Sequence, residues 1–191
     1  MASEVVFLGR EESAVLAHLR AFEDDVRVVG PSEPFVPDSP RLVISHGYRL
    51  ILRRNVLDLI PDRVINLHIS LLPYNRGADP ALWSVLEDTP AGVTIHYIDE
   101  GVDTGDVIAQ RPVEFRPDDT LATAYDKLQA EMTALFREQW PAIRSGTNER
   151  TRQAPGGTSH RVVDRVVVAH LLTDGWDTRV GPLRGRCAGS S

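Results

Sequence analysis

Short apolar runs alternate with amphipathic segments through the first part of the chain. Runs typical of buried strands occupy residues 4–9, 26–29, 41–45 and 64–69, and helical patterns occupy 11–23 and 53–60. In the first helical pattern, Val15, Leu16, Leu19 and Phe22 share one face. This alternation of strand and helix predicts a parallel α/β sheet.

The pattern changes after residue 80. A helix is predicted over 80–87, two strands over 92–98 and 107–115, a long helix over 119–144 and a last amphipathic helix over 162–173. Only a loop rich in Gly and Asp separates the two strands, so they are expected to run antiparallel at the edge of the sheet. The predicted fold class is therefore a shortened, Rossmann-like, mostly parallel α/β sheet with an antiparallel edge.

Composition narrows the classes of function. The 191 residues carry a formal net charge of −6, which disfavours a nucleic-acid partner. The single cysteine, Cys187, excludes an intrachain disulfide and fits a reducing cytoplasm, where we expect the protein to act. No apolar stretch is long enough to span a membrane, the amino terminus lacks a signal-peptide pattern, and the histidines lack zinc spacing, so we expect neither membrane nor metal.

Candidate chemistry is concentrated between residues 66 and 106. Asn66 and His68 are two apart at the end of a predicted strand, so their side chains face the same side. The carboxyl end of a parallel strand is a usual place for a ligand. An amide and an imidazole there suit a developing oxyanion, and Asp103, in a glycine-bounded loop, is placed to orient the imidazole.

Taken singly, each of these signals has a structural explanation. An Asn-x-His pair on a strand is more often structural than catalytic, and a lone Asp in a DTGD turn is more often a turn former. The ordered combination, with the sequence SLLP and an Arg-Gly pair between them, favours a catalytic site.

These motifs resemble those of the formyltransferases that use N10-formyltetrahydrofolate, over roughly residues 41–116. The resemblance implies that Asn66, His68 and Asp103 form a catalytic triad. It also implies acyl transfer without a metal: an amine attacks the formyl carbon while the Asn66 amide and protonated His68 donate to the formyl oxygen.

The resemblance further implies a folate site between two loops. The residues that it assigns to this site are Tyr48, Leu50, Ile51, Leu52, Leu57, Asp99, Glu100 and Gly101. Backbone groups of Leu50 and Leu52 would read the pterin edge, and Ile51 and Leu57 would cover its ring. An alternative is that these leucines and isoleucine simply fill the core.

The acceptor is expected to be a small-molecule amine: an amino sugar, an amino acid or a natural-product intermediate. Arg76, Gly77 and Asp79 are the predicted acceptor-binding residues, because the Asp79 carboxylate suits a cationic amine. A formyltransferase domain over 1–144 is expected to carry a short docked extension over 145–191. That short carboxyl-terminal part and the acidic charge speak against tRNA as the acceptor.

Two other functions share these motifs. In a formyltetrahydrofolate hydrolase, water replaces the amine. In a folate-binding module without catalytic activity, the site binds the folate and no reaction follows. A homodimer is also expected, because Tyr97, Val113, Phe115 and the apolar face of the 119–144 helix offer more apolar surface than a small sheet needs. The alternative is that the 162–173 helix covers that surface within one chain.

Overall fold

A computed structural model describes residues 4–23 and 25–188 and divides into two compact units. The first unit contains the residues up to His68 together with Ile95–Ala109 and Thr133–Arg152. The second contains Ile69–Thr94, Gln110–Met132 and the residues from Gln153 on. Each unit therefore draws on three separate stretches of sequence.

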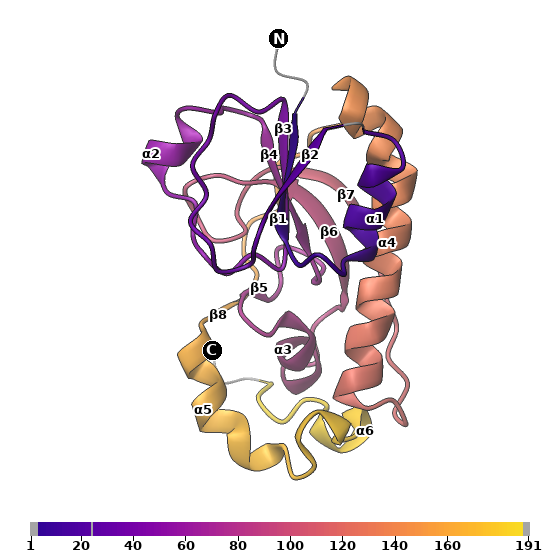
Figure 1. Cartoon of the computed structure of the whole chain (residues 1–191). Helices are drawn as coiled ribbons and strands as arrows, with labels where there is room; N and C mark the ends of the chain where they lie inside the picture. The colour runs from indigo at the N-terminus through magenta and orange to yellow at the C-terminus, as the bar shows by residue number, and fades with distance from the viewer. Residues whose placement is uncertain (1–3, 24, 189–191) are drawn as a thin grey trace. The chain divides into compact units, whose positions relative to one another are not determined.

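Figure 1 labels the strands and helices. The strands are β1 (Val5–Gly9), β2 (Val26–Val29), β3 (Leu42–His46), β4 (Val64–His68), β5 (Arg76–Gly77), β6 (Gly92–Tyr97), β7 (Val107–Pro112) and β8 (Ser159–His160). The α-helices are α1 (Ala14–Arg20), α2 (Arg54–Leu57), α3 (Pro80–Leu86), α4 (Leu121–Ser145), α5 (Arg165–Val168) and α6 (Val180–Leu183). Three 3₁₀ turns are η1 (Val162–Asp164), η2 (Ala169–Leu171) and η3 (Gly175–Asp177).

The main sheet has six strands in the order β2-β1-β3-β4-β6-β7. β1 runs parallel to both β2 and β3, and β3 runs parallel to β4. At the other end, Tyr97 N donates to Asp106 O and Val113 N donates to Ala91 O, so β6 and β7 are antiparallel. The predicted fold class is confirmed: a mostly parallel, Rossmann-like sheet with an antiparallel edge.

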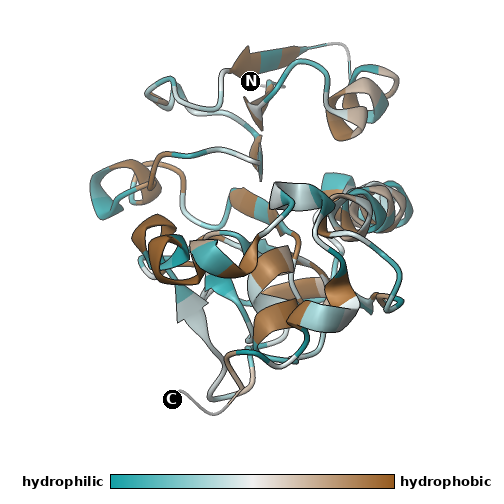
Figure 2. Ribbon diagram, turned by 90° about the horizontal axis from the view of Figure 1, so that it is seen from below, coloured by the Kyte–Doolittle hydropathy of each residue, from teal (hydrophilic) through white to brown (hydrophobic). Residues whose placement is uncertain are grey.

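Alternating strand residues build the core of the first unit. Val6 and Leu8 of β1 pack with Val43 of β3 and Val64 of β4 in one apolar cluster. In Figure 2, hydrophobic residues fall mainly on strands and helices, while many connecting loops are hydrophilic or neutral. Helix α1 starts at its N-cap, Ser13, and ends before Phe22, which is 55% exposed instead of lying on the predicted buried face.

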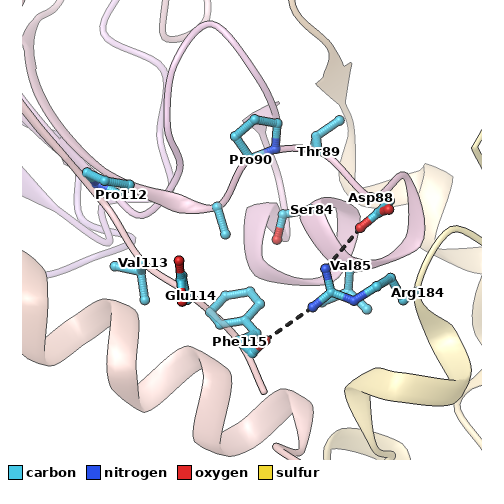
Figure 3. A pocket seen from close by; sticks show the side chains of 11 residues that line it. Ser84, Val85, Asp88, Thr89, Pro90, Pro112, Val113, Glu114, Phe115 and Arg184 are labelled. Carbon is cyan, nitrogen blue, oxygen red and sulfur yellow. Dashed lines mark hydrogen bonds and ion pairs between the residues drawn. The ribbon is translucent and has the colours of Figure 1, made fainter. Parts of the chain in front are cut away.

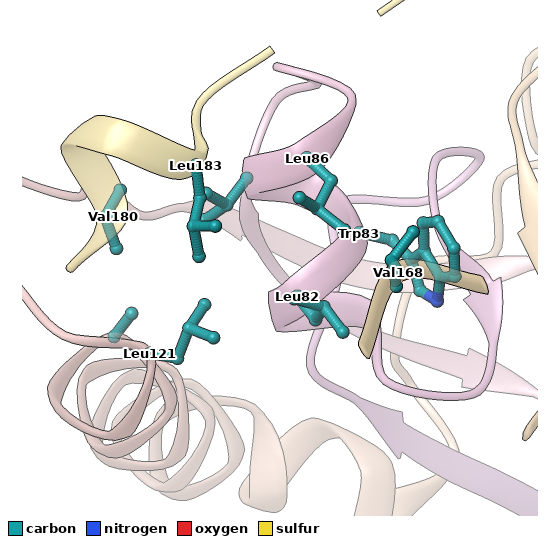
Figure 4. Close-up of a cluster of buried hydrophobic side chains, with 9 residues drawn as sticks. Leu82, Trp83, Leu86, Leu121, Val168, Val180 and Leu183 are labelled. Carbon is teal, nitrogen blue, oxygen red and sulfur yellow. The ribbon is translucent and has the colours of Figure 1, made fainter. Parts of the chain in front are cut away.

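The core of the second unit joins helices that are far apart in sequence (Figure 4). Leu82 and Leu86 of α3 pack with Leu121 of α4, Val168 of α5 and Leu183 of α6. The long helix α4 starts after Thr120, whose Oγ1 accepts a hydrogen bond from Thr123 N, as an N-cap does. Tyr125 lies four residues after Leu121, at the helical spacing of buried side chains, yet it is 40% exposed.

The predicted helix over 162–173 is broken in the structure into η1, α5 and η2. Four of its valines, Val162, Val163, Val166 and Val167, are exposed by 59–72%, and only Val168 is buried. β-Branched residues propagate a helix poorly, which accounts for the short pieces. This segment thus exposes an apolar surface on η1 and α5 instead of burying it, and self-association stays a prediction.

Candidate active site

The side chains of Asn66, His68 and Asp103 meet within the first unit. Asn66 and His68 come from β4, the strand next to β3 and β6 in the sheet. Asn66 Nδ2 donates to Asp103 Oδ1 over 3.1 Å, and His68 Nδ1 lies 3.5 Å from Asp103 Oδ2. The His68 and Asp103 side chains are only 8% and 13% exposed. The carboxylate therefore faces the imidazole and the amide at once, in a largely buried setting.

The loop between β6 and β7 delivers Asp103 to this point. Tyr97 N donates to Asp106 O at its base, and Asp99 Oδ1 accepts from Gly101 N and Thr104 Oγ1 within it. Asp103 itself has a φ of 53°, in the left-handed region that Asp tolerates better than most residues. A Cβ at Gly105 would collide with the Tyr97 carbonyl oxygen, so only glycine fits there. The DTGD turn is thus a tight support for the carboxylate.

His96, for which the sequence motifs predict no role, lies in the same cluster. Its Nε2 is 3.3 Å from Asn66 Nδ2 and 3.4 Å from Asp103 Oδ1, and its side chain is 1% exposed. The rings of His96 and His68 stand edge to face with centroids 6.3 Å apart. A polar residue in an otherwise apolar strand was the available signal, but the pattern alone does not say which strand it faces.

The two loops of the predicted folate site lie together in the first unit. Arg54, which follows the first loop, pairs with Glu100 of the second over 3.2 Å. Tyr48, Leu57 and Ile98 pack around the same apolar cluster. The structure therefore places residues 48–57 beside residues 98–101.

Members of the predicted folate set differ in exposure. Leu50 and Ile51 are 41% and 66% exposed, whereas Leu52 belongs to the buried core. Tyr48 donates from its hydroxyl to Glu33 O over 2.6 Å, and burial raises the pKa of this phenol, so it stays a donor near neutral pH. Leu50 and Ile51 are the apolar side chains of this set that a planar ring could reach.

Comparison with known proteins identifies the relatives of this chain. The sequence model of the family described as Formyl transferase matches residues 33–139, more than half of the chain. The chain belongs to this formyl transferase family. The resemblance seen in the sequence motifs is thereby confirmed.

Two solved structures extend the likeness to this formyl transferase fold. PseJ from Anoxybacillus kamchatkensis, a formyltransferase in complex with UDP-4,6-dideoxy-4-formamido-L-AltNAc and tetrahydrofolate, is 42% identical. The likeness covers 96% of this chain and 98% of PseJ, with a TM-score of 0.89. A likely sugar N-formyltransferase from Mycobacterium tuberculosis is 26% identical, with 86% of this chain and 77% of that one covered and a TM-score of 0.75.

Methionyl-tRNA formyltransferases are also relatives. The enzyme from Agathobacter rectalis is 38% identical over 150 residues, which make up 78% of this chain but only 43% of that protein. The chain thus spans less than half the length of this relative, whereas it matches nearly all of PseJ.

The residues predicted to bind the acceptor of this formyl transferase lie in the second unit. The Arg76 guanidinium donates to Gln153 Oε1 and Gly156 O, and Asp79, the N-cap of α3, lies 3.6 Å from Arg165. Gly77 has a φ of 85° and pairs with His160 in the β5–β8 ladder. Arg76 and Asp79 therefore already hold parts of the second unit together.

The SLLP segment has a structural role in the second unit. Thr94 Oγ1 donates to Ser70 O and accepts from Leu72 N. Gln110 Nε2 then donates to Leu72 O over 2.7 Å. These bonds fix the backbone that follows β4, and the Ser70 hydroxyl adds another by donating to Tyr74 O over 2.8 Å.

Two cavities contain none of the predicted site residues. A cavity of about 510 Å³ in the second unit is lined by α3 and by the segments that follow α3 and β7, with Arg184 bonded to Asp88 Oδ1 and Phe115 O (Figure 3). Another, of about 340 Å³ in the first unit, lies after β1 and β2 and has Glu11, Glu12 and Glu33 around Arg10. Three carboxylates make this second cavity a poor phosphate site.

Residues 4–23 and 25–188 contain neither a metal-binding cluster nor a membrane-spanning helix. Within these ranges no group of three or more His, Cys, Asp or Glu side chains is arranged to hold a metal ion. No helix there has both the length and the apolar character that a membrane span requires.

Proposed function

We propose that this chain is an N-formyltransferase that moves the formyl group of N10-formyltetrahydrofolate to the amine of a nucleotide-linked amino sugar. The likeness to PseJ over nearly the full length of both chains carries this proposal, since PseJ was solved with a UDP-linked formamido sugar and tetrahydrofolate. The acidic net charge of −6 also favours a small acceptor over tRNA.

The proposed reaction uses the cluster on β4 and the β6–β7 loop. The acceptor amine bonds to the formyl carbon, the bond from that carbon to N10 breaks, and one proton passes from the amine to N10. His68 Nδ1 faces Asp103, so Nε2, on the other side of the ring, donates to the formyl oxygen as negative charge builds there. Asp103 fixes the ring and, through water, helps to move the proton.

The donor would bind to the first unit between residues 48–52 and 99–101. Leu50 and Ile51 offer exposed apolar side chains for a planar ring, and the Arg54–Glu100 ion pair holds the two loops side by side. Leu52 supports the site from the core, and the partly buried Leu57 packs against that core. This assignment predicts that Ile51→Asp weakens folate binding, while Val36→Asp, at another exposed apolar position of the first unit, leaves it unchanged.

The decisive experiment supplies the donor with one acceptor at a time. We expect a UDP-linked 4-amino-4,6-dideoxy sugar to gain the mass of one formyl group, with tetrahydrofolate released in equal amount. His68→Ala should slow the formation of both products by about 10²–10³-fold. Formylation of initiator methionyl-tRNA in place of the sugar would contradict the proposed acceptor.

The same assay separates the two alternatives. Release of formate and tetrahydrofolate at the full rate without any amine would identify a formyltetrahydrofolate hydrolase. Folate binding by calorimetry with no turnover toward any acceptor would identify a binding module.

A further inference from the structure

His96 has a buried imidazole to which the proposed reaction assigns no role. It lies on β6 with its side chain 1% exposed, and the groups that face it are Asn66, Asp103 and the edge of His68. A polar ring at such a position requires hydrogen-bond partners. Those partners determine which ring nitrogen carries the hydrogen.

The Nδ1 atom of His96 lies 2.8 Å from Tyr97 O. A carbonyl oxygen can only accept, so Nδ1 must carry a hydrogen. In the neutral ring, Nε2 is then an acceptor, and it lies 3.3 Å from Asn66 Nδ2 with hydrogen-bond geometry. Nε2 also lies 3.4 Å from Asp103 Oδ1, with which it would pair only if it carried a hydrogen.

We propose that His96 is a positioning residue that fixes the direction of the Asn66 amide. Asn66 Nδ2, Asp103 Oδ1 and His96 Nε2 form a triangle with sides of 3.1, 3.3 and 3.4 Å. The carboxylate and His96 together therefore hold the Asn66 amide in one orientation.

This orientation bears on the proposed formyl transfer, on which this step rests. The Asn66 amide lies beside His68 on β4, so an amide held in one direction keeps a fixed geometry toward the formyl group. We therefore expect the loss of His96 to act on kcat and not on the binding of the folate.

The tautomer of His96 tests the proposal without any turnover. Long-range ¹⁵N–¹H correlation spectra of the histidine-labelled protein at neutral pH report which ring nitrogens carry hydrogen, and His96→Gln identifies the signals. We expect hydrogen on Nδ1 alone. Hydrogen on Nε2, alone or together with Nδ1, would overturn the proposal, because Nε2 could not then accept from Asn66.

Two substitutions separate positioning from packing. In His96→Gln the side-chain oxygen falls near the position of Nε2 and can accept from Asn66, whereas His96→Asn preserves only the donor to Tyr97 O. We expect His96→Gln to keep kcat within about threefold and His96→Asn to lose about tenfold, the value of one hydrogen bond, with an unchanged KM for the folate.

Equal losses of kcat in His96→Gln and His96→Asn, at equal thermal stability, would contradict the proposal. If the unaltered protein formylates no acceptor, the proposed function fails, while the tautomer measurement still decides the role of His96. If either variant fails to fold, the spectrum of the unaltered protein carries the test.

Discussion

Each unit of the molecule contains a largely buried histidine close to a carboxylate, and the two pairs differ in their surroundings. In the first unit, His68 lies 3.5 Å from Asp103, with Asn66 and His96 bonded to each other beside them. In the second unit, His160 Nε2 lies 3.2 Å from Glu87 Oε1, and its ring stacks on Trp83 with centroids 3.9 Å apart.

The second pair is poorly matched as a polar site. Among the residues that the structure describes, His160 Nε2, Trp83 Nε1 and Glu87 Oε2 are buried without a hydrogen-bond partner. The stacked ring there serves packing. In the first unit, an amide and a second imidazole converge on the carboxylate. An imidazole–carboxylate pair thus carries little information by itself; the groups around it distinguish a candidate catalytic site from a packed core.

Removing the imidazole of the first pair should have the largest effect. We expect His68→Ala to lower kcat/KM by about 10²–10³-fold, because the proposed donor to the formyl oxygen is lost. The fold should persist, as judged by an unchanged far-ultraviolet circular dichroism spectrum. Activity within tenfold of the unaltered protein would mean that His68 is as peripheral to the chemistry as His160.

Two glycines, one in each unit, allow a close approach to a backbone carbonyl group. A Cβ at Gly105 would collide with Tyr97 O, and a Cβ at Gly157 would collide with Pro73 O. We expect Gly105→Ala and Gly157→Ala each to destabilise the fold by about 1–3 kcal/mol in urea unfolding. Only Gly105→Ala should also lower kcat by about tenfold or more, because its loop carries Asp103. Equal losses of kcat in the two variants would show that the loop of Gly105 matters no more for catalysis than the contact of Gly157.

The pair in the second unit should matter for stability alone. We expect His160→Phe, which preserves the stacking on Trp83, to cost about 1 kcal/mol and to change kcat by less than threefold. Glu87→Gln should have a similar cost. In the double variant the costs should not add, because one pair is lost in every case; strictly additive costs in a double-mutant cycle would show that the groups do not interact.

The ion pair between Lys127 and Asp119 in the second unit should have the smallest effect on stability. Burial alone would raise the pKa of Asp119, but hydrogen bonds from Lys127 and the Arg116 backbone outweigh it and lower the pKa below its ordinary value of 3.8. The stabilisation is therefore present above pH 3.8 and is lost as the pH falls through the lowered value.

Lys127→Met should cost about 0.5–1 kcal/mol at pH 7, since the lysine is partly exposed. The cost should shrink toward zero in strong acid, where Asp119 is protonated. Urea unfolding at both extremes measures this change. A cost that does not depend on pH would point to packing of the lysine stem.

The strands could be predicted because each one is marked by apolar residues that are close together in the sequence. Asn66 and His68 share a face by spacing alone, and the Gly-bounded loop places Asp103 near them once β6 and β7 pair. The role of His96 could not be predicted, because its partners depend on β4 and β6 being neighbours in the sheet. A local sequence pattern does not show which strands are neighbours. Equally, apolar periodicity over 162–173 could not reveal that valine-rich sequence would break into short turns with four valines exposed.

The interleaving of the units has a consequence for how such a gene can change. The chain passes between them five times, after His68, Thr94, Ala109, Met132 and Arg152, and three of these passages lie inside β6, β7 and α4. No single recombination event can exchange one whole unit for another. New acceptor preferences would therefore arise by point substitution and loop insertion, within a framework that is inherited as one piece.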